Sequence, residues 1–202
     1  MKKIVVTLAV IFGLSITQSN AQSISGGIKA DANLSNFLLS DMNNVESNMK
    51  FGASLGGFMK IDFSETFALQ PELLFHYKSS EMKLGGGATD YEYWSAEIPI
   101  YAMGQFTAGN GRFYVGIGPY VGLGFSAKYK TGDIDLYEKN DNDESAMNRW
   151  DFGGGAIVGY EFGGGIQINA SYKIGFLDMM DAGRDNASMN TNTISLGIGY
   201  RF

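Results

Sequence analysis

Apolar residues alternate with small or polar residues along the last fourteen positions of the chain, from Met189 to Phe202. A two-residue period predicts a β-strand whose two faces meet different environments. One face of this segment carries Ile194, Leu196, Ile198, Tyr200 and Phe202, and the other carries Thr193, Ser195, Gly197, Gly199 and Arg201.

The same alternation recurs along the chain, and no segment holds a 3.6-residue period that would predict a long helix. We therefore predict an all-β fold, an eight-stranded antiparallel up-and-down transmembrane β-barrel. The eight strands are expected at residues 22–34, 49–63, 67–80, 91–107, 112–128, 149–162, 166–178 and 190–202.

The connections between these strands alternate between long and short. Membrane barrels have short periplasmic turns and longer outside loops, so eight strands with both ends in the periplasm need four loops and three turns. The sequence offers four long polar segments, at 35–48, 81–90, 129–148 and 179–189. It offers three short ones, at 64–66, Asn110-Gly111 and 163–165.

The turns also predict the pairing of their flanking strands. Asn-Gly favours a two-residue hairpin turn, because both positions tolerate positive φ. This turn would pair Gly109 with Arg112, and further on Phe106 with Val115. The other two turns would pair Phe63 with Phe67, Ile61 with Leu69, and Phe162 with Ile166.

One face of the predicted strands is apolar and the other is rich in glycine and charge. A soluble, lipocalin-like binding barrel would turn the apolar face inward, and this is the main alternative. Glycines suit a crowded eight-strand interior, and aromatic residues gather at strand ends, as in the girdles of membrane barrels. The expected girdle has Trp94 and Trp150 at the outer rim and Phe106 and Phe162 at the inner rim, joined there by Phe63, Phe67, Phe113 and Phe202.

The charged residues on the polar face are expected to pair inside the lumen, because buried charges need partners. The hairpin at 64–66 would place Lys60 opposite Gln70 and diagonal to Glu72. Structural packing is one interpretation of this network and a narrow ion path is the other. Its expected members are Lys29, Lys60, Asp62, Glu72, Glu97, Glu161, Lys173 and Arg201, with Asp31, Lys78 and Asp151 on the same face.

The three prolines, Pro71, Pro99 and Pro119, all fall inside predicted strands. A closed barrel has no free edge, so each proline removes a ladder hydrogen bond. We therefore predict local bulges or twisted pairing at these positions.

The first twenty-one residues predict a cleaved signal peptide, with Lys2 and Lys3 before an apolar run and Ser19-Asn20-Ala21 as the cleavage site. Residues 22–202 would then form one barrel domain in the cell outer membrane. The net charge of −6 argues against nucleic-acid binding.

No cofactor, metal or catalytic site is expected from the sequence. The chain has no cysteine, and its acidic segment at 133–144 lacks the spacing of an EF-hand. His76 is the single histidine. Ser54 is its expected cross-strand neighbour, but Glu72 lies about 13 Å away along the strand, too far for a catalytic set. We therefore predict that the protein is not an enzyme.

Several short motifs resemble the PorT-like family of outer-membrane β-barrels. They are Gly27-Ile28-Lys29-Ala30 with Asn33-Leu34, the segment from Phe67 to Leu73, Glu97-Ile98-Pro99-Ile100, and Gly116-Ile117-Gly118-Pro119-Tyr120. The resemblance implies the barrel fold and an association with protein secretion, for which a few members of the family are known.

The expected function is thus structural or protein-interacting, with a narrow channel as the alternative. The expected partners are outer-membrane lipid and lipopolysaccharide, the barrel-assembly machinery and other envelope proteins. Tyr200 and Phe202 are the expected assembly signal.

Overall fold

The structure is a computed structural model and describes residues 23–40, 45–84, 87–129, 134–135, 137, 147–178 and 188–202. The predicted signal peptide, residues 1–21, lies outside the described residues, as do parts of the predicted loops. The described residues include no helix that is long and apolar enough to cross a membrane.

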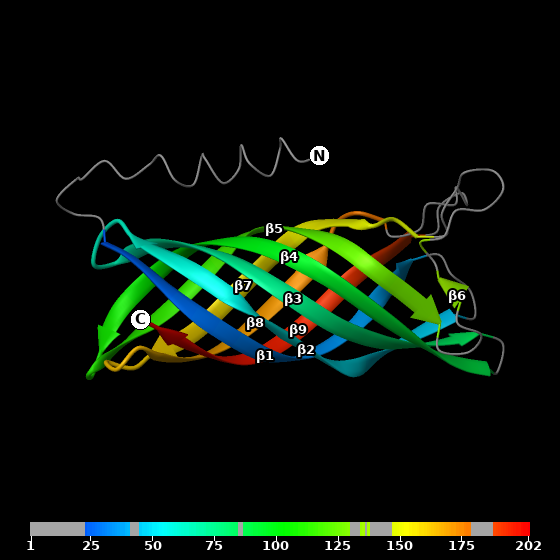
Figure 1. Cartoon of the computed structure of the whole chain (residues 1–202), viewed down its shortest axis with the longest axis horizontal. Coiled ribbons are helices and arrows are strands. Elements are labelled where there is room, and N and C mark those ends of the chain that lie inside the picture. Colours follow the sequence, from blue (N-terminus) through cyan, green and yellow to red (C-terminus); the bar gives the residue numbers. More distant parts are fainter. Residues whose placement is uncertain are drawn as a thin grey trace.

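Eight long antiparallel strands form a closed ring, which confirms the predicted fold (Figure 1). They wind at a slant around the long axis of the molecule. Neighbours in the sequence pair with each other, and β1 closes the ring by pairing with β9. The strands are β1 (Ser23–Ser40), β2 (Val45–Asp62), β3 (Phe67–Leu84), β4 (Gly87–Ala108), β5 (Gly111–Tyr129), β7 (Trp150–Glu161), β8 (Ile166–Gly175) and β9 (Ser188–Arg201); the two-residue β6 (Ile134–Asp135) pairs with the end of β5.

The strands extend further at the loop end of the barrel than the sequence predicted. The segments expected as loops at 35–48 and 81–90 are mostly strand, since β1 and β2 are separated by residues 41–44 and β3 and β4 by residues 85–86. Residues 35–48 hold no strict two-residue alternation, and the run Gly85-Gly86-Gly87 is typical of a loop, so the pattern did not predict these strand ends.

Two of the three predicted turn registers are correct and one is wrong. Ile61 pairs with Leu69, and the Phe162 amide donates to the Ile166 carbonyl at 2.8 Å, as predicted. The third hairpin pairs Ala108 with Gly111, so its two-residue turn is Gly109-Asn110 and Phe106 faces Phe113 instead of Val115. Gly109 takes the positive φ, at 62°. The error is two positions, so every side chain keeps its predicted face.

The prolines lie within strands but do not cause the predicted bulges. Pro71 lies in β3, Pro99 in β4 and Pro119 in β5. Pairing on either side of them keeps one register, with Pro99 opposite Tyr120 and Ala102 opposite Ile117. The register shifts instead between Met49 and Ala53 and between Trp94 and Ser95.

The apolar face of the barrel points outward and the charged face points inward. Leu196 and Ile198 are 65% and 64% exposed, whereas Lys60 and Glu72 are buried. A soluble lipocalin-like barrel requires the opposite arrangement, so the structure contradicts that alternative.

Candidate functional site in the barrel lumen

The polar side chains of the lumen form clusters stacked along the barrel axis. The end of the barrel that carries the three short turns is called the turn end, and the other is called the loop end. Each cluster is built from inward-facing positions of several strands, because alternate residues of every strand point to the axis.

Glu161 of β7 is the centre of the first cluster, at the turn end. It accepts from Lys60 Nζ at 3.2 Å, Arg201 Nη2 at 2.7 Å and Gln167 Nε2 at 2.8 Å. These donors come from β2, β9 and β8; β8 is the neighbour of β7 in the ring, whereas β2 and β9 are not, so the carboxylate also joins strands that do not pair with its own. Two cations and an amide thus share one carboxylate in charge-assisted hydrogen bonds across the lumen.

Asp62 of β2 lies at the same end and forms a separate group. It accepts from Gln105 Nε2 at 2.7 Å and from Ser23 Oγ at 3.2 Å. Arg112 Nη1 lies 3.9 Å from the carboxylate and is partly exposed. This group closes the side of the turn end that Glu161 does not reach.

An apolar belt lies beyond the turn-end groups and fills the lumen. Each residue of the belt is at most 3% exposed, and the members are Ala68, Tyr101, Met103, Tyr114 and Ile157. The Tyr114 ring lies against Gly159, where an added Cβ would also meet the Ile168 carbonyl oxygen at 2.5 Å. The Tyr114 ring therefore leaves no room for a side chain at Gly159.

Glu72 and Lys29 form the middle cluster. Lys29 Nζ lies 3.1 and 3.4 Å from the two Glu72 oxygens, and Gln70 Nε2 donates to Glu72 at 2.9 Å. Asp31 lies 3.7 Å from Lys29 and accepts from Ser54 Oγ at 3.0 Å. One cation is thus shared by two carboxylates, each with a further neutral donor.

Glu97 of β4 is the centre of the cluster nearer the loop end. It accepts hydrogen bonds from the ammonium groups of Lys78 and Lys173. His76 Nε2 lies 3.2 Å from the same carboxylate, and Asn33 Nδ2 lies 3.3 Å from His76 Nδ1. Lys173 Nζ also lies 3.3 Å from His76 Nε2, so the imidazole lies within hydrogen-bond distance of a carboxylate, an ammonium group and an amide.

Asp151 of β7 closes the series of clusters toward the loop end. It accepts from Thr191 Oγ1 at 2.8 Å, and the Tyr120 hydroxyl lies 3.3 Å from both of its oxygens. Lys173 Nζ lies 5.7 Å from the centre of the Tyr120 ring, a cation–π distance. This ring therefore connects the Asp151 group to the Glu97 cluster.

The structure brings the predicted charged residues into the lumen. The register of β2 and β3 agrees with the predicted place of Lys60, opposite Gln70 and diagonal to Glu72. Its ammonium group nevertheless binds Glu161, and the cation of Glu72 is Lys29. The alternation also placed several uncharged partners on the inward face without identifying them as members of the clusters. These are Asn33, Gln70, Gln105, Tyr120, Gln167 and Thr191.

The lumen shows no arrangement suited to catalysis or metal binding among the described residues. Ser54 lies opposite His76 in the ladder, but its hydroxyl donates to Asp31. No group of three or more histidine and carboxylate side chains in the described ranges is arranged to hold a metal ion.

The predicted girdle residues lie on the outer surface near the strand ends. Trp94 and Trp150 are exposed toward the loop end, and Trp94 lies 4.9 Å from the Tyr77 ring. Phe106 and Phe162 are exposed toward the turn end. Tyr200 and Phe202 are also exposed, and the Phe202 amide donates to the Gly26 carbonyl at 2.9 Å.

Comparison with known proteins gives a family and a fold. Residues 17–181 match the model of a family described as "Outer membrane protein beta-barrel domain". The fold resembles that of the outer membrane protein OprG from Pseudomonas aeruginosa, with a TM-score of 0.54, 12% identity, and coverage of 88% of this chain and 96% of that one. It also resembles Neisserial surface protein A, with a TM-score of 0.51, 15% identity, and coverage of 89% and 99%. No curated protein matches the chain in sequence.

Proposed function

The chain belongs to the family of the outer membrane protein beta-barrel domain, and from this membership we propose that it acts as a structural or protein-interacting barrel with a closed lumen. The exposed aliphatic face would contact lipid and lipopolysaccharide, and the short turns would lie in the periplasm. Processing of a signal peptide at residues 1–21 would precede insertion by the barrel-assembly machinery, with Tyr200 and Phe202 as the assembly signal.

The apolar belt is the observation that carries the closed-lumen proposal. Tyr101, Met103, Tyr114 and Ile157 reach into the axis from β4, β5 and β7, and all four are buried. An ion that crossed this belt would exchange its hydration shell for the hydroxyl groups of Tyr101 and Tyr114 and for otherwise apolar side chains. A narrow channel, the alternative function, would therefore need these four side chains to move.

Conductance separates the two functions. The purified barrel, reconstituted in planar bilayers, is expected to give no unit steps above the background of protein-free bilayers. Reproducible steps whose size changes in Met103→Ala would support the channel and reject the closed lumen. Heat-modifiable migration on gels and recovery in the outer-membrane fraction test insertion independently of conductance.

A non-enzymatic role is part of the proposal. His76 is buried between Glu97 and Asn33, and the serine opposite it is engaged with Asp31. His76 is 1% exposed, so a substrate would have to enter the packed lumen to reach it. Unchanged behaviour of His76→Gln in any activity assay would agree with this view.

A narrower proposal, association with protein secretion, is supported by the resemblance to the PorT-like family alone. Co-purification after mild cross-linking in the native envelope tests it. Recovery of secretion components would support the association, and recovery of none would remove it while leaving the barrel assignment intact.

A further inference from the structure

The part of the lumen between the apolar belt and the loop end contains more buried acids than bases. Its four carboxylates are at most 7% exposed and its three ammonium groups at most 6%. The acids are Asp31, Glu72, Glu97 and Asp151, and the bases are Lys29, Lys78 and Lys173. One negative charge is therefore left without a buried counter-charge among the described residues, which is unfavourable in an interior of low dielectric constant.

A protonated His76 would supply a fourth positive charge, but its surroundings oppose one. Its Nε2 lies 3.3 Å from Lys173 Nζ, so a charged imidazole would face an ammonium group at close range. Two like charges at this distance repel each other strongly in a buried site. Charge balance in this part of the lumen therefore requires either a proton on one carboxylate or a cation from outside the chain.

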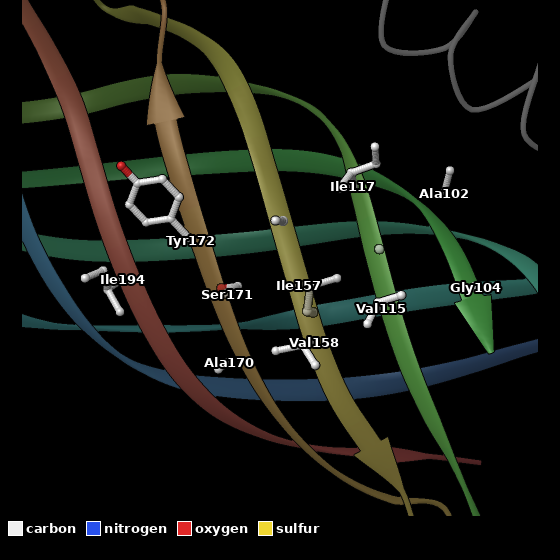
Figure 2. Close-up of a pocket in the computed structure, with 12 residues that line it drawn as sticks. Ala102, Gly104, Val115, Ile117, Ile157, Val158, Ala170, Ser171, Tyr172 and Ile194 are labelled. Atoms are coloured by element: carbon white, nitrogen blue, oxygen red, sulfur yellow. The ribbon is translucent and has the colours of Figure 1, made fainter. Parts of the chain in front are cut away.

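Two lumen glycines flank Asn169 of β8 in the middle of the barrel. Gly197 of β9 lies opposite Asn169 on one side, and Gly159 of β7 lies opposite it on the other. Val158 and Ala170 pair on the outer wall, as Figure 2 shows, so the next residues of these two strands, Gly159 and Asn169, face the lumen. The two glycines leave the space on both sides of Asn169 to side chains from more distant strands.

Asp31 and Tyr114 use this space from opposite sides. A Cβ added at Gly197 would overlap Asp31 Oδ1 and would lie 3.1 Å from Asn169 Nδ2. A Cβ added at Gly159 would overlap the Tyr114 hydroxyl. The carboxylate of β1 and the hydroxyl of β5 therefore approach Asn169 over its two glycine neighbours.

Three oxygen atoms of this row are buried without a hydrogen-bond partner among the described residues. They are Asp31 Oδ1, Asn169 Oδ1 and Tyr114 Oη, and each belongs to a side chain that is at most 7% exposed. Asp31 Oδ1 lies 3.7 Å from Lys29 Nζ, beyond hydrogen-bond length. A half-turn of the Asn169 amide brings Oδ1 beside Asp31, and Oδ1 has no partner to lose.

We propose that Asp31 Oδ1 and the Asn169 amide oxygen bind one monovalent alkali cation, Na⁺ or K⁺, which balances the charge of the enclosed lumen. Carboxylate and amide oxygens are ligands of hard cations. Ser54 donates to the other Asp31 oxygen at 3.0 Å, a contact that suits the ionised carboxylate. A divalent cation would replace the missing charge by an excess of the same size.

This inference rests on the closed lumen proposed above, because ions that passed freely through the barrel would screen the uncompensated charge. The two proposals fail in different measurements. Unit conductance steps contradict the closed lumen, whereas the dependence of stability on the cation tests the site at Asp31.

Urea unfolding in vesicles of zwitterionic phosphatidylcholine measures the cation directly. Na⁺ is replaced stepwise by N-methylglucamine, which is too large for the space beside Asn169, at constant chloride and at about pH 8, above the ordinary pKa of histidine. For one cation bound by the folded state alone, each tenfold rise in Na⁺ above its dissociation constant multiplies the folded-to-unfolded ratio by about ten. A parallel series with K⁺ is run, and this gain with either ion supports the site.

Two substitutions locate the cation. Asp31→Asn removes the surplus charge and keeps the shape of the side chain. It should abolish the gain from Na⁺ and K⁺ and be at least as stable in N-methylglucamine as the unmodified chain. Glu81→Gln, which removes a partly exposed carboxylate near the loop end, is the matched control and should keep the full gain. Heat-modifiable migration of each variant shows that the barrel has folded.

Three results would overturn the cation site. The first is equal stability of the unmodified barrel in Na⁺, K⁺ and N-methylglucamine. The second is a stability that changes with pH but not with the cation, which would assign a proton to the carboxylate instead. The third is a full gain from Na⁺ in folded Asp31→Asn, which would exclude Asp31 as a ligand.

Discussion

Replacing Glu97 with glutamine should destabilise the barrel more than any other single charge change near the loop end. Glu97 is 1% exposed and accepts from Lys78 and Lys173, with His76 Nε2 at 3.2 Å. The substitution keeps the shape of the side chain and leaves two buried ammonium groups without a counter-charge. Removing one partner of a buried ion pair costs about 3–5 kcal/mol, so we expect a loss of that order in the free energy of unfolding.

The magnitude can be checked against an exposed pair in the same chain. Lys50 and Glu81 lie 3.6 Å apart with side chains 33% and 24% exposed. Exposed pairs contribute about 0–1 kcal/mol, so Glu81→Gln should change stability little. Adding Lys173→Met to Glu97→Gln removes one of the two uncompensated charges and should recover part of the loss.

Urea unfolding in lipid vesicles, followed by tryptophan emission, measures these differences. The two tryptophans of the sequence, Trp94 and Trp150, are both exposed on the outer wall, so their emission should shift on transfer from lipid to water. The reasoning is refuted if Glu97→Gln costs less than about 1 kcal/mol, the upper value for an exposed pair. It is also refuted if adding Lys173→Met lowers the free energy of unfolding further.

Three further changes test other parts of the structure by the same measurement. Gly56→Ala should cost about 1–3 kcal/mol, because the new Cβ would lie 2.9 Å from Leu74 Cα. Gly57→Ala is the control and should be near neutral, because its Cβ would meet a single atom at 3.3 Å. Equal effects of the two substitutions would contradict the packing. Leu196→Arg should cost about 2–4 kcal/mol at mid-depth and Leu38→Arg about 0–1 near the loop end; a reversed order would contradict the depth assignment. Gly165→Ala should cost about 1–3 kcal/mol because Gly165 has φ of 85°. Gly164→Ala, with nothing within 4 Å of its Cβ, serves as the control and should leave the unfolding midpoint unchanged.

The sequence was sufficient to predict which side of each strand faces the axis. Alternation carries this information locally, so it survived even where the turn was placed one residue too far along, at Asn110-Gly111 instead of Gly109-Asn110, and the strand register changed by two. It was insufficient for the strand ends at 35–48 and 81–90, where strict alternation is lost or is interrupted by the three glycines 85–87. The register shifts between Met49 and Ala53 and between Trp94 and Ser95 were not predicted either; Gly52 lies within the first, and Gly124 is the partner of Ser95 at the second.

Several of the ion pairs within the lumen could not be predicted, because they join strands that are distant in the ring. The contact between Lys60 and Glu161 links β2 to β7, and that between Lys173 and Glu97 links β8 to β4. Such contacts depend on the stagger of the closed barrel, which no single hairpin determines. The local register suggested Glu72 for Lys60, and the closure of the barrel brings Glu161 to it.

Contact between lipid and protein methyl groups tests most directly whether the apolar face of the barrel points outward to lipid and the charged face inward. The barrel is labelled at isoleucine methyl groups, and through-space transfer of magnetisation from lipid acyl chains to these methyl groups is measured by NMR in bilayers. Ile168, Ile194 and Ile198, which are exposed on the wall, should show strong transfer. Ile157, which is 3% exposed in the apolar belt, should show none. Strong transfer to Ile157 with none to the other three would contradict the account.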